Sequence, residues 1–232
     1  AAVGLTTART ASRPAPERAD CAQLVRPLRR RLKLKTLGVS PMDGNSHECT
    51  LIYLHGFCGN AKGYLDGACD WSYPWRLGFD YAPGLRVVLP VAPRLRQPWG
   101  EVRRAWYTYP SKGVNSIGDP STLAASRDGI RQLLQQEIKR LGGAAHRCFL
   151  GGLSQGCTVA LDIYLREGPA LGLGGFVGSV GFVPCDHLGF LGADKALCRL
   201  ASDPVQARRP LWLQCATDDQ EDVPWELVRW SL

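Results

Sequence analysis

The feature that most constrains the fold is an alternation of short apolar segments with segments of helical periodicity. Residues 121–141 and 155–168 place their apolar side chains on one face of a helix. The apolar runs end in turn residues and predict buried parallel strands; they are residues 50–57, 85–93, 146–153, 173–182 and 210–216. Parallel neighbours need crossover helices, so the alternation predicts an α/β protein with a doubly wound, mostly parallel sheet. Residues 31–39 alternate like an edge strand.

The net charge of +7 is concentrated at the start of the chain. Residues 1–36 hold nine of the 28 Lys and Arg residues, and the other 196 residues carry 19 basic and 19 acidic side chains. A neutral body offers no positive face to a phosphate backbone, so we expect no nucleic-acid partner. The composition of the first 25 residues predicts a disordered leader over residues 1–30, or a plastid or mitochondrial transit segment. Residues 31–232 then form one domain.

Nine cysteines are scattered singly along the chain, an odd number with no CxxC pair. This usage indicates a reducing compartment, so we expect a cytoplasmic protein unless the leader directs it to an organelle. The four histidines form no cluster with the spacing of zinc ligands, and we expect neither a metal nor a cofactor. No stretch approaches the roughly 18 apolar residues of a membrane span, so no transmembrane segment is expected.

The sequence Gly152-Leu153-Ser154-Gln155-Gly156 joins a predicted strand to a predicted helix, which is the context of a nucleophile elbow. The sharp turn lifts the serine hydroxyl above the carboxyl edge of the sheet. The two glycines remove side chains that would collide where the helix crosses the strand. Ser154 is therefore the candidate nucleophile. The alternative is a plain turn whose serine caps the helix.

A serine hydroxyl is a weak nucleophile, so the site also needs a base, an acid that orients the base, and donors for the oxyanion. One predicted donor is the backbone N–H of Gln155, directly after the nucleophile. The other is the backbone N–H of Phe57, in the turn His55-Gly56-Phe57 at the end of an earlier strand. The alternative for this turn is a strand end whose glycine only eases the chain reversal.

Six segments occur in the order found in one enzyme family: LHGFCGN, LPVAPRLRQ, AWYTY, GGLSQGCTVALDIYL, GGFVGSVGFVP and LWLQCATDDQEDVPW. Over about residues 48–230 the chain resembles the acyl-protein thioesterase and carboxylesterase family, also grouped as phospholipase/carboxylesterase. The resemblance implies an α/β-hydrolase fold without a large lid domain. It implies as substrates the acyl thioesters of S-acylated proteins, lysophospholipids or short carboxylic esters. Thr108 stands where the family usually has Asp, which bears on substrate preference.

The acid of the site is implied by the same resemblance. The family pattern H-G-x-x-D-x-x-V-P is replaced here by CATDDQEDVP over residues 215–224, with no His-Gly and one extra residue. Counting from the start of the motif selects Asp219, with a single insertion after it. Asp218 and Asp222 are the alternatives, and a solvated acidic loop is the remaining one.

In the family the catalytic histidine follows the acid by a few tens of residues, past one more helix and strand. This sequence has no histidine after His187. We therefore expect a C-terminally truncated chain that lacks the last helix and strand, exposes apolar surface and is inactive as residues 1–232 alone. His187 as a substitute base is the alternative, whereas His55 is structural in the family pattern.

These features predict a serine hydrolase of carboxylic esters or acyl thioesters that works through an acyl-enzyme on Ser154. Asp219 would orient the histidine, and the amides of Phe57 and Gln155 would hold the oxyanion. The alternative is a catalytically inactive relative that binds acyl chains or a protein partner. A dienelactone hydrolase or a peptidase would share the elbow, but a dienelactone hydrolase would favour cysteine at position 154.

Overall fold

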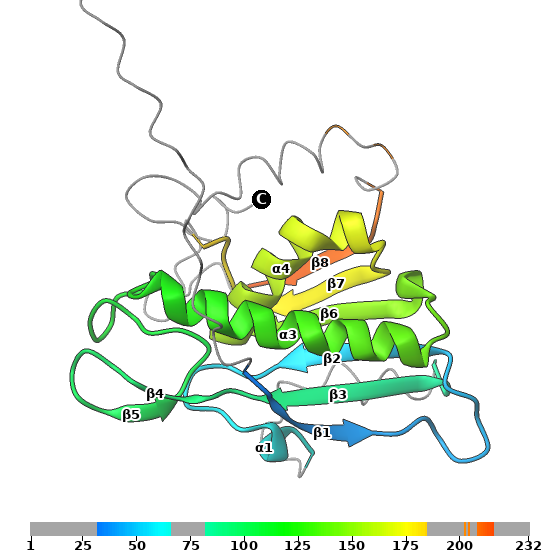
Figure 1. Cartoon of the computed structure of the whole chain (residues 1–232), viewed down its shortest axis with the longest axis horizontal. Coiled ribbons are helices and arrows are strands. Elements are labelled where there is room, and N and C mark those ends of the chain that lie inside the picture. The colour runs from blue at the N-terminus through cyan, green and yellow to red at the C-terminus, as the bar shows by residue number, and fades with distance from the viewer. Residues whose placement is uncertain (1–31, 66–81, 185–201, 203, 205–207, 216–232) are drawn as a thin grey trace, which may run out of the picture. The chain divides into compact units, whose positions relative to one another are not determined.

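The computed structural model describes residues 32–65, 82–184, 202, 204 and 208–215, and everything below concerns these residues (Figure 1). The predicted leader and the acidic segment after residue 215 lie outside them. The strands are β1 (Lys35–Val39), β2 (Cys49–Leu54), β3 (Leu85–Val91), β4 (Arg94–Arg96), β5 (Val102–Arg104), β6 (Cys148–Leu153), β7 (Gly175–Ser179) and β8 (Leu211–Gln214). The helices are α1 (Ala61–Leu65), α3 (Pro120–Arg140), the short 3₁₀ helix η1 (Ala145–Arg147) and α4 (Gln155–Leu171).

Six of the strands form one sheet in the order β1-β3-β2-β6-β7-β8. β1 pairs antiparallel with β3 at one edge, and all the other neighbours are parallel. The doubly wound, mostly parallel sheet predicted from the sequence is thus confirmed, and residues 31–39 contribute the edge strand expected of them. β4 and β5 pair separately as an antiparallel hairpin.

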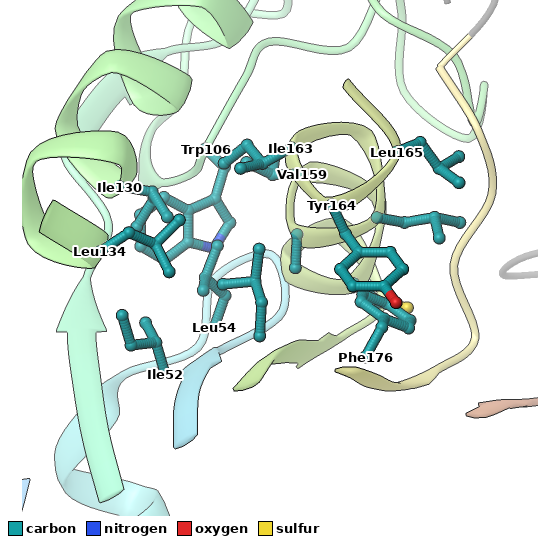
Figure 2. Close-up of a cluster of buried hydrophobic side chains, with 14 of the residues drawn as sticks. Ile52, Leu54, Trp106, Ile130, Leu134, Val159, Ile163, Tyr164, Leu165 and Phe176 are labelled. Atoms are coloured by element: carbon teal, nitrogen blue, oxygen red, sulfur yellow. The ribbon is translucent and has the colours of Figure 1, made fainter. Parts of the chain in front are cut away.

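Both faces of the central strand β2 are buried, which explains its continuous apolar sequence. Alternate side chains point to opposite faces of a strand. Ile52 and Leu54 belong to the cluster that packs under α3 and α4, whereas Leu51 and Tyr53 belong to the cluster that includes α1. Figure 1 shows α3 and α4 together in front of the sheet. Figure 2 shows the side chains of their cluster.

The helix α3 begins and ends where its sequence predicts, within one residue. The side chain of Asp119 caps it by accepting a hydrogen bond of 2.8 Å from the Ser121 N–H, and Pro120 occupies the first turn, where its missing N–H costs nothing. Gly142 and Gly143 follow with φ of 66° and 89°, a left-handed conformation that glycine adopts without penalty.

The end predicted for the second helix, at Gly168, is wrong. α4 continues through Pro169 to Leu171 and ends at Gly172, whose φ of 72° and ψ of 35° are those of a left-handed cap. Gly168 is buried instead, and a Cβ there would lie 3.1 Å from the ring of Tyr164. Close packing against that ring therefore accounts for the glycine that sequence reasoning took as a stop signal.

A buried ion-pair network joins α3 to α4. The carboxylate of Asp162, fully buried, accepts hydrogen bonds from the Nε atoms of Arg127 at 2.9 Å and Arg166 at 2.5 Å. Arg131 on α3 also pairs with Glu167 on α4. The negative charge of Asp162 is thus compensated by Arg127 and Arg166 within the helix layer, as a buried carboxylate requires.

The last described strand departs from expectation in its burial. Residues 211–214 form a strand as predicted, but Leu211 is 37% exposed and Trp212 is 68% exposed. β8 pairs only with β7 in the described sheet and is the last strand in its order. An apolar strand would be buried at the centre of the sheet, whereas this one lies at an edge and is exposed to solvent. Among the described helices none is both long and apolar enough to cross a membrane.

Candidate active site

Ser154 occupies the turn between β6 and α4 in a backbone conformation rare for a residue with a side chain. Its φ is 50° and its ψ is −122°, which costs about 1–3 kcal/mol and is held by the structure around it. Its N–H donates to the carbonyl of Ser179 at the end of β7 (2.9 Å), and its carbonyl accepts from the N–H of Thr158 in α4 (3.0 Å). Its side chain makes no capping hydrogen bond, contrary to the helix-cap alternative.

The glycines on either side of the elbow are required by close contacts. A Cβ on Gly152 would lie 2.6 Å from the carbonyl carbon of Gly156, where the strand meets the helix. A Cβ on Gly156 would lie 2.4 Å from the carbonyl oxygens of both Leu54 and His55. No side chain fits at such distances, so the start of α4 rests directly on the end of β2.

The turn that follows β2 lies beside Ser154. β2 and β6 are parallel neighbours with Leu54 opposite Gly152, so both strands end at the same edge of the sheet. A Cβ on Gly56 would lie 3.4 Å from the Cβ of Ser154. The two amides predicted as oxyanion donors, those of Phe57 and Gln155, flank this contact. Neither donates a hydrogen bond to any group in the described part of the chain.

His55 holds the turn to the next strand and is 1% exposed. Its Nε2 accepts a hydrogen bond from the N–H of Ala92 (3.1 Å), so the proton of the neutral ring is on Nδ1, which donates to the carbonyl of Gly56 (2.8 Å). Burial lowers the pKa of His55 from 6.5 to about 4, against the hydrogen bond to Gly56, which raises it. His55 is therefore a neutral structural residue.

Sequence reasoning missed two side chains that hold the site together. The Oε1 atom of Gln155 accepts a hydrogen bond from the backbone N–H of Trp106 (2.8 Å), and its Nε2 donates to the backbone carbonyl of Tyr107 (2.9 Å). The indole N–H of Trp106 donates to the His55 carbonyl (2.7 Å). A buried carboxamide must find partners, so Gln155 within an apolar helix was a signal, but the sequence does not say which groups it meets.

Thr108, which replaces the family's usual Asp, has a structural role in this fold. Its hydroxyl accepts a hydrogen bond from the N–H of Asp119 at 3.1 Å, and its own N–H donates to the hydroxyl of Thr122 at 3.1 Å. The residue thus fixes the chain after Trp106 to the beginning of α3.

Aromatic side chains gather around the turn after β2. The ring of Phe57 lies edge-on to those of Trp99 (6.3 Å between centroids) and Tyr109 (5.2 Å), and Tyr109 contacts Tyr107 in the same way (5.4 Å). The Cys58 N–H donates to a carbonyl of the β4–β5 hairpin at 3.0 Å, which ties the hairpin to this turn. One proposed oxyanion donor therefore belongs to a residue whose own side chain forms part of an apolar wall.

The remaining members of the predicted site fall elsewhere. Asp219, its alternatives Asp218 and Asp222, and His187 lie outside the described residues. His47 hydrogen bonds to the Thr50 hydroxyl (2.7 Å), and no described histidine hydrogen bonds to Ser154. Within the same ranges, no three His, Cys, Asp or Glu side chains are grouped so that they could hold a metal ion.

The sheet topology, the strained serine between strand and helix and the adjoining turn define an α/β-hydrolase. A sequence model of the phospholipase/carboxylesterase family matches residues 41–188, more than half of the chain. The chain belongs to this family. This confirms the family that the sequence motifs indicated.

Curated relatives carry the name acyl-protein thioesterase 1. The protein from Schizosaccharomyces pombe is 27% identical over 152 residues, covering 66% of this chain and 63% of the relative. The protein from Yarrowia lipolytica is 30% identical over 144 residues, covering 60% of this chain and 59% of the relative. The matched part thus spans less than two thirds of either relative.

Solved structures show the same fold. The crystal structure of Zea mays acyl-protein thioesterase 2 matches with a TM-score of 0.60 and 21% identity, covering 85% of this chain and 81% of that one. The crystal structure of Arabidopsis thaliana SOBER1 matches with a TM-score of 0.56 and 22% identity, covering 79% and 80%. At these identities the likeness establishes the architecture, and activity has to be argued from the site.

Proposed function

We propose that the protein is a serine hydrolase of carboxylic esters or acyl thioesters that works through an acyl-enzyme on Ser154. The observation that carries the proposal is the conformation of Ser154. A serine held at φ 50° between strand and helix, with its hydroxyl unused for capping, lies beside two backbone N–H groups without an acceptor among the described residues. Backbone strain of this kind is characteristic of functional sites.

In the proposed reaction the Ser154 oxygen attacks the acyl carbonyl carbon while the base takes its proton. The carbonyl electron pair moves to the oxygen, which accepts hydrogen bonds from the amides of Phe57 and Gln155. Collapse of the tetrahedral intermediate breaks the bond to the alcohol or thiol, which leaves with the proton from the base. Water then repeats the sequence on the acyl-enzyme and releases the acid. Each oxyanion donor of this type contributes about 10²–10³ in rate.

Asp219 is the acid in this proposal, with Asp218 and Asp222 as its alternatives. Its carboxylate would fix the tautomer of a histidine base and stabilise the imidazolium that forms during attack. The base in this proposal is a histidine outside the described residues. None of the described histidines is proposed for it, since His55 is already bonded through both ring nitrogens.

The proposed substrates are acyl thioesters of S-acylated proteins, lysolipids or short carboxylic esters. Support comes from the names of the curated relatives and from the aromatic side chains of Phe57, Trp99 and Tyr109, which give an acyl chain apolar surface beside the oxyanion turn. The site uses backbone amides and side chains alone, so the proposal includes no cofactor. The proposed location is the cytoplasm, where S-acylated proteins present their thioesters.

A fluorophosphonate probe tests the proposal, because it reacts covalently with an activated serine. Protein from the complete coding sequence should be labelled, and Ser154→Ala should abolish the labelling. The matched control is Ser111→Ala, since Ser111 is exposed and bonds to other described residues through its backbone carbonyl and not through its side chain. A folded wild-type protein that stays unlabelled would overturn the proposal and leave the non-catalytic acyl-chain binder as the reading of this fold.

A further inference from the structure

The two proposed oxyanion amides belong to segments about 100 residues apart in the sequence. The Phe57 amide follows β2, and the Gln155 amide begins α4. Their separation decides whether both can reach one oxygen atom, which requires donors within about 2.7–3.1 Å of its position. A series of buried hydrogen bonds, called the circuit below, connects the two segments.

The first part of this circuit is the carboxamide of Gln155, a residue that is 1% exposed. Its oxygen accepts from the backbone N–H of Trp106 and its nitrogen donates to the carbonyl of Tyr107, so one side chain bonds to two successive residues of that segment. The two bonds fix the orientation of the carboxamide and use its oxygen and nitrogen together. The residue that supplies one oxyanion amide therefore also anchors the Trp106 backbone.

The second part is the indole of Trp106, which is fully buried. Its N–H donates to the carbonyl of His55, two residues before Phe57, and its ring packs at 5.3 Å from the imidazole of His55. On its other side the Trp106 carbonyl accepts a hydrogen bond from the Ser126 hydroxyl on α3. Figure 2 shows the indole between the α3 side chains and Leu54.

We propose that the Gln155 side chain and the Trp106 indole are positioning residues that hold the two oxyanion amides at their working separation. The proposal rests on the proposed function, since it concerns the same oxyanion hole. The circuit runs from the Gln155 backbone through its carboxamide, Trp106 and the His55 carbonyl to the turn that carries the Phe57 amide. Displacing a reacting group by about 1 Å can cost about 10²-fold in rate, so loosening this circuit should act on the chemical step.

The decisive variants remove hydrogen bonds of the circuit; Trp106→Phe also reduces the buried volume, whereas Gln155→Met keeps it nearly constant. Trp106→Phe deletes the indole N–H that holds the His55 carbonyl, and Gln155→Met deletes both carboxamide bonds. The matched control is Ile130→Val, which removes one methylene from the same buried cluster at a cost of about 0.5–1.5 kcal/mol and touches neither amide. Melting curves and circular dichroism establish that each variant is folded.

The readouts separate positioning from general destabilisation. An oxyanion donor acts in the transition state, so kcat on a soluble p-nitrophenyl ester should fall about 10- to 100-fold in both variants while KM stays within about twofold. The affinity of a trifluoromethyl ketone, which forms a tetrahedral oxyanion adduct with the serine, should fall by the same factor as kcat. Ile130→Val should leave both quantities at the wild-type level.

Two results would overturn the inference while leaving the proposed function intact. One is an active, Ser154-labelled wild type whose folded Trp106→Phe variant keeps its kcat. The other is a loss of kcat with unchanged affinity for the ketone. A wild type that neither labels nor turns over would instead remove the proposed function and the inference with it. If Trp106→Phe fails to fold, Ser126→Ala takes its place as the test, because it removes the hydrogen bond to the Trp106 carbonyl. This variant should lower kcat several-fold, and an unchanged kcat would overturn the inference.

Discussion

Acidification from pH 7 to pH 4 should destabilise this protein through His55. The folded state holds the imidazole neutral, because burial lowers its pKa to about 4 and its Nε2 accepts a hydrogen bond from the Ala92 N–H. In the unfolded chain the pKa returns to 6.5. Between these values the unfolded state binds more protons than the folded state, so stability falls as the pH falls.

The size of the effect follows from the two pKa values. The stabilisation by neutral His55 is complete above pH 6.5 and declines until about pH 4, where the folded ring also becomes protonated. At about 1.4 kcal/mol per pH unit the total loss is about 3 kcal/mol, a large part of the 5–15 kcal/mol of an ordinary domain. Protonated Nε2 cannot accept from Ala92, so the oxyanion turn should loosen only near and below pH 4, where the folded ring takes up its proton.

Urea unfolding at intervals between pH 7 and pH 4 measures this contribution. Other groups titrate as well, so the comparison is with His55→Gln, which has no titrating ring at this position. The free energy of unfolding of the wild type minus that of His55→Gln should fall by about 3 kcal/mol from pH 6.5 to pH 4. A constant difference, or an NMR titration of the His55 ring near pH 6.5, would refute the reasoning.

Two further changes test the packing around the site. Gly156→Ala should lower the melting temperature and abolish labelling of the serine, because a Cβ there would lie 2.4 Å from two carbonyl oxygens at the end of β2; wild-type melting and labelling would contradict the elbow geometry. Asp162→Ala should cost about 3–5 kcal/mol in urea unfolding, because it leaves the charges of Arg127 and Arg166 without their buried partner. Glu101→Gln, which breaks an exposed pair, is the control and should change little. Equal losses of unfolding free energy in Asp162→Ala and Glu101→Gln would contradict the role of burial.

The order and type of the six sheet strands and of α3 and α4 could be predicted because apolar periodicity reports local structure directly, whereas the short elements α1, η1, β4 and β5 were not predicted. Strand ends and helix starts fell within a few residues of their observed places, as for α3 with its Asp119 cap. The end of α4 could not be read in the same way. Gly168 and Gly172 look alike in the sequence, and only the ring of Tyr164 against the first and the left-handed conformation of the second distinguish them.

Burial and contacts between distant residues were beyond the sequence for a different reason. An apolar run such as residues 211–214 predicts a strand but not whether that strand is central or at an edge, which depends on pairing partners. The site shows the same limit. Ser154 could be predicted from a local motif, whereas the bond of Gln155 to Trp106 joins positions 49 residues apart and exists only once the sheet has brought them together.

The proposed function requires Ser154 to be an activated nucleophile. Intact-protein mass spectrometry of the full gene product after exposure to a fluorophosphonate, followed by peptide mapping, tests it most directly. We expect a single adduct on the peptide that contains Ser154, absent from Ser154→Ala and present in Ser111→Ala. A folded protein that gains no adduct, or gains it on another residue, would contradict it.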